Sequence, residues 1–548
     1  MGETSEKIMK VVLSISFFFL FLISGLSQEG KYWVFFTDKD GMEFNPYDYF
    51  DDKAIERRQA LGISLSDITD FPVNPSYINE VEEYVTSISH HTRWFNALAV
   101  YASLDEIENV KNLSFVKEVM SFSKNQMTIT DEYFEESDAK SDSLIKYQTE
   151  RMGRSEFQKA NIDGTGIRIA VLDAGFTDAD INPCFDHLRN EKRIIATYDF
   201  VKNDLDVYKG HYHGTAVLSC IGGVYNAKGK SDTLGLATGA EFILARTEKA
   251  LIEVFSEEEN WMAAVEWSDR NGADIINSSL GYTGNRYFYR DMNGMNTLVS
   301  RAGNLAAKKG ILVVNSAGND GAGDWNFVGA PADADSVLAV GGLLPWNGIH
   351  TSFSSVGPTY DFRQKPNVTA YGHVIAAKKD HISETQGTSF SSPLAAGFAA
   401  CAWQANRNWT NMELFHELEK GSDLYPYCDY AHGYGVPQAS YFLGKTESVN
   451  ASLTLKLKDA EVNIIITNPS LSFGENRTEL EMLFSDSVTC LNDYEDYLFY
   501  QFQTPDGIIM SYKVIDLQGA KTYSFTYPSK ADKVVVYYEG YTTEMKLK

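Results

Sequence analysis

The chain has 548 residues and is 44% hydrophobic, so it is longer than one ordinary domain and has enough apolar material for more than one large core. Its formal net charge of −26 argues against nucleic acid and anionic membrane surfaces as partners. The sequence contains no internal repeat, no zinc motif and no phosphate-binding loop.

The first 27 residues have the pattern of a secretory signal peptide. Lys7 and Lys10 precede a mostly apolar run at 11–23, and small residues follow before Gln28. A membrane anchor is the alternative, but the apolar run is shorter than the roughly 20 residues that a spanning helix needs. No later segment has the length and apolarity of a span, so we expect a secreted or cell-surface protein with no stable membrane span.

Residues 28–120 are predicted to form a separate α+β unit. Strand and helix patterns follow one another there, at 32–36, 51–60, 94–101, 104–112 and 115–119. The next segment, 121–150, contains an acidic, Ser-rich stretch with little to bury. We expect it to be an exposed linker that a protease can cut.

Two polar residues then stand at the predicted ends of buried elements. The apolar, β-branched run at 167–172 predicts a strand buried on both faces, hence a parallel one, and Asp173 ends it. Open α/β sheets bind ligands at the carboxyl ends of their strands, which is where Asp173 would lie. His213 opens an apolar segment with a helical pattern. Each residue alone is more often structural than catalytic.

The segment 387–393, Gly-Thr-Ser-Phe-Ser-Ser-Pro, adds a candidate nucleophile. It places Ser389 where a glycine-permitted turn enters an apolar helix predicted over 390–402, with Pro393 in the first turn. The helix dipole puts partial positive charge beside Ser389. A serine hydroxyl becomes reactive when an imidazole accepts its proton and a fixed anion stabilises the imidazolium, and these are the residue types present.

The order Asp, His, Ser along the chain differs from the orders in α/β-hydrolases and chymotrypsin-like enzymes. Over about residues 150–445 the chain resembles the subtilisin-like (subtilase) serine peptidases. The matching motifs are Val-Leu-Asp-Ala-Gly at 171–175, His-Gly-Thr-Ala-Val at 213–217, Asn-Ser-Ala-Gly-Asn at 315–319, and 387–393. The resemblance implies a three-layer α/β fold with a central parallel sheet for residues 151–445.

The resemblance also implies roles for single residues. Ser389 would be the nucleophile, His213 the general base and then acid, and Asp173 the residue that orients His213. Asn319 matches the side-chain donor of the oxyanion hole, with the Ser389 backbone N–H as second donor. The implied activity is hydrolysis of peptide bonds in proteins or peptides through an acyl-enzyme intermediate, with no required cofactor.

Two further segments match the family's substrate-binding walls. Ser279, Leu280 and Gly281 would pair with the substrate backbone, and the pocket for the residue before the cut bond would be walled by Ser316, Ala317 and Gly318. Ordinary strand-to-helix loops are the alternative for both. All of these loops follow predicted buried strands, so they should open on one edge of the sheet.

The chain departs from the family pattern at several positions. Ala174 stands where the family usually has Ser or Thr, so a hydrogen bond that supports Asp173 is expected to be missing. Phe390 and Ser391 replace the usual Met-Ala after the nucleophile. The family often holds calcium as a structural ion, for which Asp333 with Asp335 is a candidate, although most acidic clusters are simply solvated and the metal ligands stay unknown.

Residues 28–120 lie just upstream of the subtilase-like segment and look like the family's inhibitory propeptide. This resemblance predicts a zymogen with its own propeptide as intramolecular inhibitor. A plain accessory domain is the alternative. For the whole chain, the rival to an active peptidase is a binding protein or an inactive subtilase scaffold.

Residues 446–548 change to short alternating runs and are predicted to form a β-sandwich. Their end loosely resembles the C-terminal sorting domains of secreted Bacteroidetes proteins, with a plain accessory domain as the alternative. Five cysteines cannot all pair within one chain. Cys220 and Cys401 are expected as buried free thiols, and a Cys401–Cys428 bridge stays open.

Overall fold

A computed structural model describes residues 29–122, 141–227, 230–249, 256–284, 286–445, 449–458, 460–467 and 496–547. The predicted signal peptide, residues 123–140 of the predicted linker, and Cys490 lie outside the described residues. The chain divides into two compact units, and each is described by itself. Unit 1 comprises Met1–Pro46 and Ser66–Lys124, and unit 2 comprises Tyr47–Leu65 and Asn125–Lys548.

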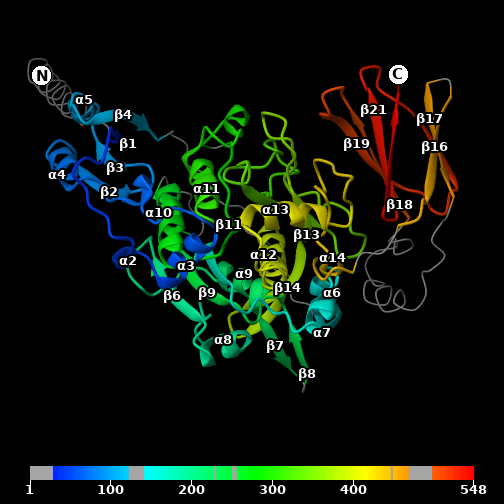
Figure 1. The fold of residues 1–548 in the computed structure, drawn as a ribbon, viewed down its shortest axis with the longest axis horizontal. Helices are drawn as coiled ribbons and strands as arrows, with labels where there is room; N and C mark the ends of the chain where they lie inside the picture. Colours follow the sequence, from blue (N-terminus) through cyan, green and yellow to red (C-terminus); the bar gives the residue numbers. More distant parts are fainter. Residues whose placement is uncertain are drawn as a thin grey trace, which may run out of the picture. The chain divides into compact units, whose positions relative to one another are not determined.

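Unit 1 is an antiparallel sheet with helices on one face, drawn in blue in Figure 1. Alternate β1 residues Tyr32, Val34 and Phe36 pack against both helices. Helix α5 (Leu104–Lys111) begins at a capping box, in which the Glu106 carboxylate accepts from the Ser103 N–H at 2.7 Å. The strand order is β2-β3-β1-β4, and the elements are β1 (Gly30–Phe36), β2 (Ser87–Thr92), β3 (Ala97–Ala102), β4 (Val116–Ser121), α4 (Pro75–Glu82) and α5 (Leu104–Lys111). This alternation agrees with the predicted α+β unit.

One segment of the predicted N-terminal unit packs elsewhere. Residues 47–65, with α2 (Pro46–Tyr49) and α3 (Asp52–Ala60), belong to unit 2. In α3, Ala54, Ile55, Arg57 and Arg58 are buried. The range 28–120 therefore does not fold as one body, because this helix buries its side chains in the second unit.

Unit 2 is built on a parallel sheet. In the part of the chain that the structure describes, the sheet has seven strands in the order β13-β12-β11-β10-β5-β9-β6. All six residues of β5 are buried, which confirms the prediction of a central strand covered on both faces. The strands are β5 (Arg168–Asp173), β6 (Ile194–Asp199), β9 (Glu241–Arg246), β10 (Ile275–Ser278), β11 (Leu312–Ser316), β12 (Val337–Leu343) and β13 (Val368–Tyr371).

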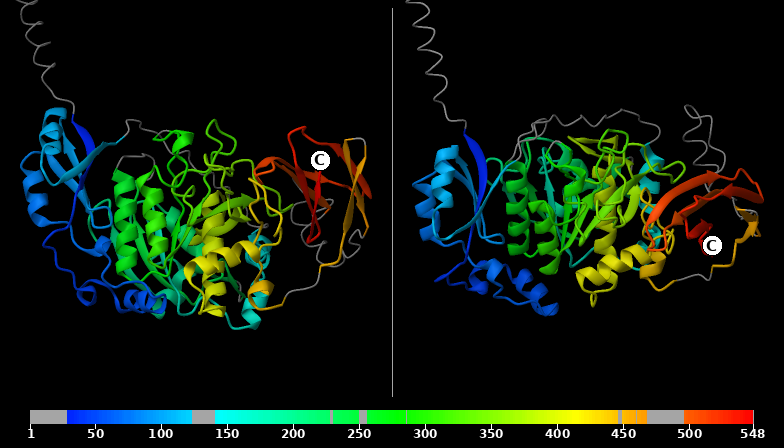
Figure 2. Two further views of the ribbon diagram at one scale, coloured as in Figure 1. Left: turned by 45° about the horizontal axis from the view of Figure 1, so that its top comes forward. Right: turned by 90° about the horizontal axis from the view of Figure 1, so that it is seen from above.

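Long helices cover both faces of this sheet (Figure 2). Helices α9 (His213–Gly222) and α12 (Thr388–Ala405) pack on each other and on one face, and α10 (Ser256–Arg270) packs with α11 (Leu298–Lys308) on the other. Ile169 and Val171 of β5 share their core with Phe390, Leu394 and Phe398 of α12. The predicted three-layer α/β fold is confirmed. Shorter elements are α7 (Arg154–Lys159), α8 (Asp186–Asn190), α13 (Asn411–Lys420), α14 (Ala439–Phe442), β7 (Val224–Ala227), β8 (Lys230–Thr233), β14 (His373–Lys378) and β15 (His381–Gln386).

Helix α6 (Ser141–Glu150) occupies the end of the predicted linker. Leu144 and Ile145 are buried, and the Gln148 side-chain amide donates to the Leu234 carbonyl at 2.7 Å and accepts from the Ile375 N–H at 2.9 Å. Residues 141–150 thus belong to the packed body of unit 2, and the linker ends earlier than its composition suggested.

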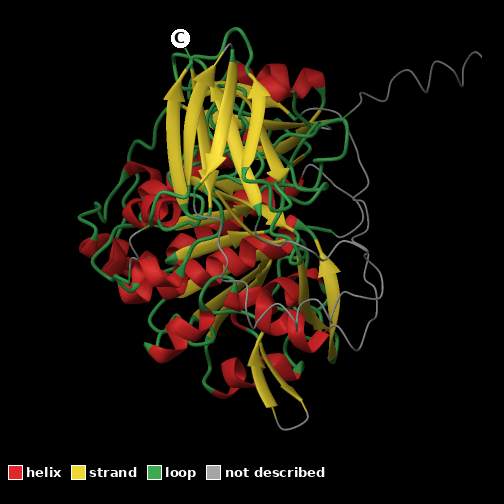
Figure 3. Ribbon diagram, turned by 90° about the vertical axis from the view of Figure 1, so that its right-hand side faces the viewer, coloured by secondary structure: helices red, strands yellow, loops and turns green. Residues whose placement is uncertain are grey.

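The C-terminal region consists of two antiparallel sheets, seen as the yellow strands near the C-terminus in Figure 3. Ile464 from one sheet and Leu498 and Val536 from the other lie in a common core. This confirms a β-rich C-terminal domain. In its described part the sheets are β16-β17-β20 and β19-β18-β21-β22, with β16 (Leu453–Lys458), β17 (Glu461–Ile466), β18 (Tyr497–Gln503), β19 (Ile509–Asp516), β20 (Thr522–Thr526), β21 (Lys533–Tyr538) and β22 (Tyr541–Lys546).

The cysteines within the described residues, Cys184, Cys220, Cys401 and Cys428, are free thiols. The Cys401–Cys428 bridge that the sequence left open is not formed. Burial raises the pKa of the Cys220 thiol to about 12, so this side chain stays a neutral thiol and an apolar packing group. Within the same residues, no helix combines the length and the apolarity that crossing a membrane requires.

Candidate active site

Asp173 and His213 meet at the carboxyl end of β5. Asp173 is fully buried, and its Oδ1 lies 2.8 Å from Nδ1 of His213. The same oxygen accepts from the Ala174 N–H at 2.7 Å. The other oxygen, Oδ2, has no hydrogen-bond partner among the described residues. The missing support that Ala174 led us to expect is therefore visible as an unpartnered carboxylate oxygen.

Two glycines allow this close approach. Helix α9 begins at His213, and the Gly214 N–H donates to the Gly175 carbonyl at 2.9 Å. A Cβ atom at Gly214 would lie 2.5 Å from that carbonyl oxygen and 2.9 Å from the Asp173 Cβ. Gly175 has φ of +142°, where a side chain would be strained and would also meet the His211 backbone. The strand end and the helix start can lie side by side only because both positions lack side chains.

Ser389 is the second residue of α12 and is 5% exposed. The preceding Gly387 caps this helix with φ of +144°. The ring of the next residue, Phe390, has its centroid 5.5 Å from that of His213, so the start of α9 lies against the first turn of α12. Ser389 lies in the first turn of α12, where the dipole favours developing negative charge.

Pro393 lies farther into the helix than the sequence predicted. Helix α12 begins at Thr388 instead of 390, so Pro393 is inside it, beyond the first turn. Proline has no N–H to donate four residues back, which leaves the Ser389 carbonyl without its helical donor. Ser279 Oγ donates to that carbonyl at 2.8 Å instead, and Ser389 Oγ is 3.5 Å from the Ser279 carbonyl. Because Pro393 lacks an N–H, the Ser389 carbonyl is free to accept from Ser279, and this hydrogen bond joins α12 to the residue after β10.

Asn319 presents its amide in a fixed orientation. Its Oδ1 accepts from the Thr388 N–H and from Thr388 Oγ1, both at 2.9 Å. This assigns Oδ1 to the inner side and leaves Nδ2, which makes no hydrogen bond to the described residues, as the outward donor. Thr388 was not singled out from the sequence, although its place next to Ser389 and its paired donors are what an anchor for Asn319 needs.

The two predicted substrate walls follow neighbouring parallel strands, with Ser278 of β10 opposite Asn315 of β11. The Asn315 side chain donates to the Leu280 carbonyl at 2.9 Å. In the described part of the chain, the N–H and carbonyl of exposed Gly281 form no hydrogen bond. The backbone of Gly281, three residues after β10, is therefore available for pairing with an extended peptide.

The other predicted wall, Ser316 to Gly318, is fixed by hydrogen bonds to Thr388 and Ser355. Ser316 and Ala317 are buried, and the Gly318 N–H donates to Thr388 Oγ1 at 3.3 Å. The Ser355 N–H donates to the Gly318 carbonyl at 2.9 Å. Thr388 therefore links the wall, Asn319 and the Ser389 helix. The predicted site residues lie at or just after the carboxyl ends of parallel strands, except His213 and Ser389, which lie at helix starts.

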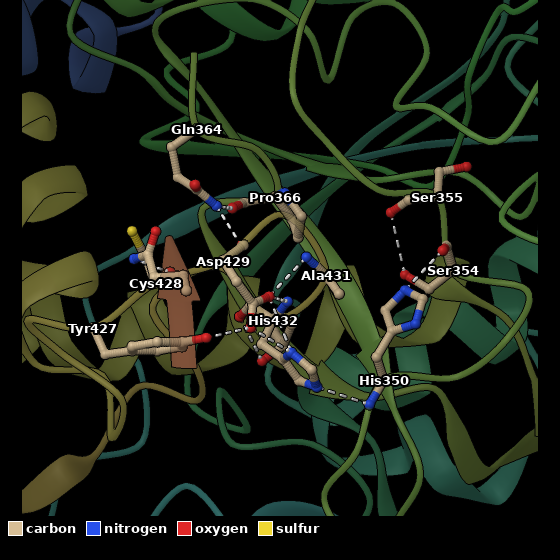
Figure 4. A network of polar contacts seen from close by, with 12 residues as sticks. His350, Ser354, Ser355, Gln364, Pro366, Tyr427, Cys428, Asp429, Ala431 and His432 are labelled. Carbon is tan, nitrogen blue, oxygen red and sulfur yellow. Dashed lines mark hydrogen bonds and ion pairs between the residues drawn. The ribbon is translucent and has the colours of Figure 1, made fainter. Parts of the chain in front are cut away.

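Figure 4 shows a second aspartate–histidine pair, Asp429 and His432, in a network of polar contacts. His432 Nδ1 is 3.0 Å from Asp429 Oδ1, but its Nε2 accepts from the His350 N–H at 3.1 Å. Both ring nitrogens of His432 are thus used inside the protein. Tyr427 Oη also donates to Asp429 at 3.1 Å, so this network holds a loop rather than a reactive group.

The contacts of Asp333 and Asp335 do not support the suggested calcium site. Asp333 is fully buried, Oδ2 accepts from the Gly294 N–H at 2.7 Å, and Oδ1 accepts from Ser300 Oγ at 2.5 Å. Burial raises the pKa of the Asp333 carboxyl. Asp335 is exposed, and among the described residues no group of three or more His, Cys, Asp or Glu side chains could hold a metal ion.

Comparisons with known proteins agree with this geometry. The profile of the subtilase family matches residues 164–435, and that of the peptidase S8 propeptide domain of Bacteroidota matches residues 31–140. The central domain belongs to the subtilase family. The family resemblance seen in the motifs is confirmed, and the α+β segment before this subtilase domain is a propeptide domain, not a plain accessory domain.

Curated relatives of this subtilase include three bacterial proteins. Alkaline elastase YaB of Bacillus sp. (strain YaB) is 29% identical over 267 residues, 48% of this chain and 61% of the relative. Minor extracellular protease Epr of Bacillus subtilis (strain 168) is 28% identical over 404 residues, 72% and 56% of the two chains. Subtilisin Savinase of Lederbergia lenta is 28% identical over 263 residues, 47% and 84%. The chain thus spans about three fifths of the first two relatives.

Proposed function

We propose that this subtilase is a secreted serine endopeptidase that is made as a zymogen. The observation that carries the proposal is the Asp173–His213 contact of 2.8 Å beside the Ser389 end of α12. It supplies an anion, a base and a hydroxyl in the order that nucleophilic acyl transfer needs.

In the proposed reaction, His213 removes the proton from Ser389 Oγ as that oxygen bonds to the carbonyl carbon of the peptide. The oxyanion that forms accepts hydrogen bonds from Asn319 Nδ2 and from the Ser389 N–H. His213 then gives its proton to the leaving amine, the C–N bond breaks, and an acyl-enzyme remains. Water, deprotonated by His213, hydrolyses that ester and restores Ser389. Asp173 holds the imidazole and stabilises its charged form.

Substrate would bind as an extended strand. Gly281 offers backbone groups on one side, and Ser316 to Gly318 form the other wall. These contacts are sequence-tolerant because they address the peptide backbone. The extracellular protease among the relatives, together with the N-terminal signal-peptide pattern, supports secretion.

The propeptide domain is proposed to act as an intramolecular inhibitor until the linker is cut. If the enzyme cuts its own linker, processing requires Ser389. The Ser389→Ala precursor should then stay full-length when purified away from other proteases, while the parent precursor is trimmed between about residues 120 and 155. Normal trimming of the isolated Ser389→Ala protein would argue for processing by another enzyme.

The decisive test of the function is labelling with a fluorophosphonate after propeptide removal. Covalent labelling at Ser389 and peptide hydrolysis are expected for the parent, and neither for Ser389→Ala. Ser352→Ala, a change at an exposed serine, is the matched control and should behave as the parent. Because Ser389 supplies the bond-forming oxygen, turnover should fall by about 10⁴-fold or more. A Ser389→Ala protein that kept a tenth of parent turnover would contradict Ser389 as the nucleophile. A parent that took no label after propeptide removal would favour the inactive-scaffold alternative.

A further inference from the structure

The arm at residues 47–65 lies within the match to the propeptide domain, yet it packs as part of unit 2. Its helix α3 carries two adjacent arginines, Arg57 and Arg58, that are 6% and 0% exposed. Arginine is rarely buried to this extent unless it is paired. Both guanidinium groups are therefore expected to contact an acidic side chain.

One carboxylate receives both arginines. Asp269, near the end of α10, is 1% exposed. Its Oδ1 is bound by Arg57 Nη2, and its Oδ2 by Arg58 Nη2 at 2.6 Å. Arg57 also donates to the carbonyls of Ala273 and Lys309. The guanidinium of Arg58 lies 4.2 Å from the centroid of the Phe50 ring, which covers it from within the arm.

A ring of further contacts surrounds this pair. Lys53 Nζ is 3.1 Å from Asp274 Oδ2 and donates to the Gly166 carbonyl at 2.8 Å. Asp51 Oδ1 accepts from Arg168 Nη1 at 2.8 Å. Each of these charged side chains of the arm thus contacts an opposite charge on the subtilase domain, which is the complementarity of a specific interface.

The fit is also steric. A Cβ atom at Gly310 would lie 2.4 Å from the Leu61 side chain of the arm, and one at Gly272 would lie 2.9 Å from the Lys53 Cβ. Both glycines have positive φ, at +87° and +74°. The turns of the subtilase domain are therefore shaped so that the arm can lie directly against them.

This contact is far from the candidate active site along the strands. Arg168 begins β5, Asp274 directly precedes β10, and Gly310 precedes β11. These are the amino ends of the parallel strands, whereas Asp173 is the last residue of β5 and Ser279 and Asn319 follow the carboxyl ends of β10 and β11. The arm binds the opposite edge of the sheet, so it does not itself block the candidate active site.

We propose that the amino edge of the sheet is a docking surface for the propeptide, with Asp269 as the receptor of Arg57 and Arg58, and that it holds the propeptide independently of the active site. The proposal rests on the propeptide role given above. A propeptide bound at two places stays at high effective concentration when one contact opens. Cutting the linker alone then leaves the inhibitor in place, and release also requires the arm to detach.

The test uses the full-length Ser389→Ala protein with the recognition sequence of a specific protease inserted within residues 123–140. After cleavage, the N-terminal fragment should co-elute with the rest of the chain in gel filtration. Arg57→Gln with Arg58→Gln should release the fragment at least tenfold faster on dilution, and so should Asp269→Asn on the receptor side. Glu56→Gln and Gln59→Ala, at exposed positions of the same helix, are the matched controls and should retain it.

Equal release rates for the parent, the arginine variants and Asp269→Asn would overturn the proposal. If the double variant fails to fold by circular dichroism, the single Arg57→Lys substitution keeps the charge but loses the forked contacts, and its release should still be faster than that of the parent. Every protein in this test lacks Ser389, so the retention result is independent of peptidase activity. Failure of the docking surface and failure of the proposed function are thus told apart.

Discussion

The two edges of the parallel sheet use polar groups in opposite ways. At the carboxyl edge, Asp173 Oδ2, Asn319 Nδ2 and the backbone of Gly281 have no partner among the described residues. At the amino edge, Asp269 has both oxygens bound by buried arginines. Asn319 Nδ2 and the Gly281 backbone thus leave hydrogen-bonding groups for the proposed substrate, whereas Asp269 uses both of its oxygens inside the protein.

The sharpest way to separate the edges is Asn319→Ala. This change removes a donor that is used only when the oxyanion forms, so kcat should fall by about 100- to 1000-fold with KM nearly unchanged. The free energy of unfolding should fall by only about 1–2 kcal/mol, from loss of the two bonds that Oδ1 accepts from Thr388, so the variant stays folded under assay conditions. Steady-state kinetics on a peptide substrate measures the effect, and a loss confined to KM would contradict the assigned role.

At the amino edge the corresponding change is Arg58→Met in the Ser389→Ala precursor. It leaves Asp269 Oδ2 without its Arg58 donor while Arg57 still neutralises the carboxylate, and an unmade hydrogen bond to a buried charged group costs about 1.5–3 kcal/mol. Urea unfolding followed by fluorescence should show this loss, whereas Glu56→Gln should lie within about 0.5 kcal/mol of the parent. A change below about 1 kcal/mol would mean that the arm contributes little to the precursor.

Acid should weaken the carboxyl edge. His373 follows β13, and burial lowers its pKa from 6.5 to about 4. Between these values the unfolded chain binds a proton that the native chain does not, so the free energy of unfolding decreases as pH falls from 6.5 to 4. His373→Gln should remove on the order of 2 kcal/mol of this loss. The exposed His381→Gln is the control, and parallel pH profiles for His373→Gln and the parent would contradict the prediction.

The smallest expected effect is that of Ala174→Ser. A hydroxyl next to Asp173 can donate to the unpartnered Oδ2, and one hydrogen bond changes kcat/KM by roughly 2- to 10-fold, here upward. Ala174→Gly supplies no hydroxyl and serves as the comparison. If serine and glycine had the same effect, the missing bond at Oδ2 would not limit catalysis.

Much of the carboxyl edge could be predicted because local patterns determine it. The apolar run before Asp173 and the glycine-rich motifs fix strand ends and helix starts, which depend on neighbours in sequence. The sequence predicts the start of α12 two residues late, because a proline is expected in the first turn of a helix. In the structure Ser279, more than a hundred residues away, satisfies the carbonyl that Pro393 leaves without a donor.

The amino edge could not be predicted for the same reason. Arg57 and Arg58 lie in a charged helix pattern that normally faces water, and nothing near them in the sequence indicates Asp269. Helix α6 likewise lies in a segment whose composition predicts a linker. Its Gln148 side chain bonds to the backbone of Leu234 and Ile375, which are far away in the sequence. Contacts across hundreds of residues are set by the tertiary fold.

The bond from Ser279 Oγ to the Ser389 carbonyl has a consequence for how this site can change. One side chain belongs to the strand end that would hold a substrate and also completes the helix that carries the candidate nucleophile. A mutation at Ser279 would change both the substrate-binding segment and the start of α12, so substitutions at Ser279 and near Ser389 should be non-additive. Across relatives, we expect Pro393 and Ser279 to be substituted together. A change of substrate specificity at this segment would then also change the position of the candidate nucleophile's helix.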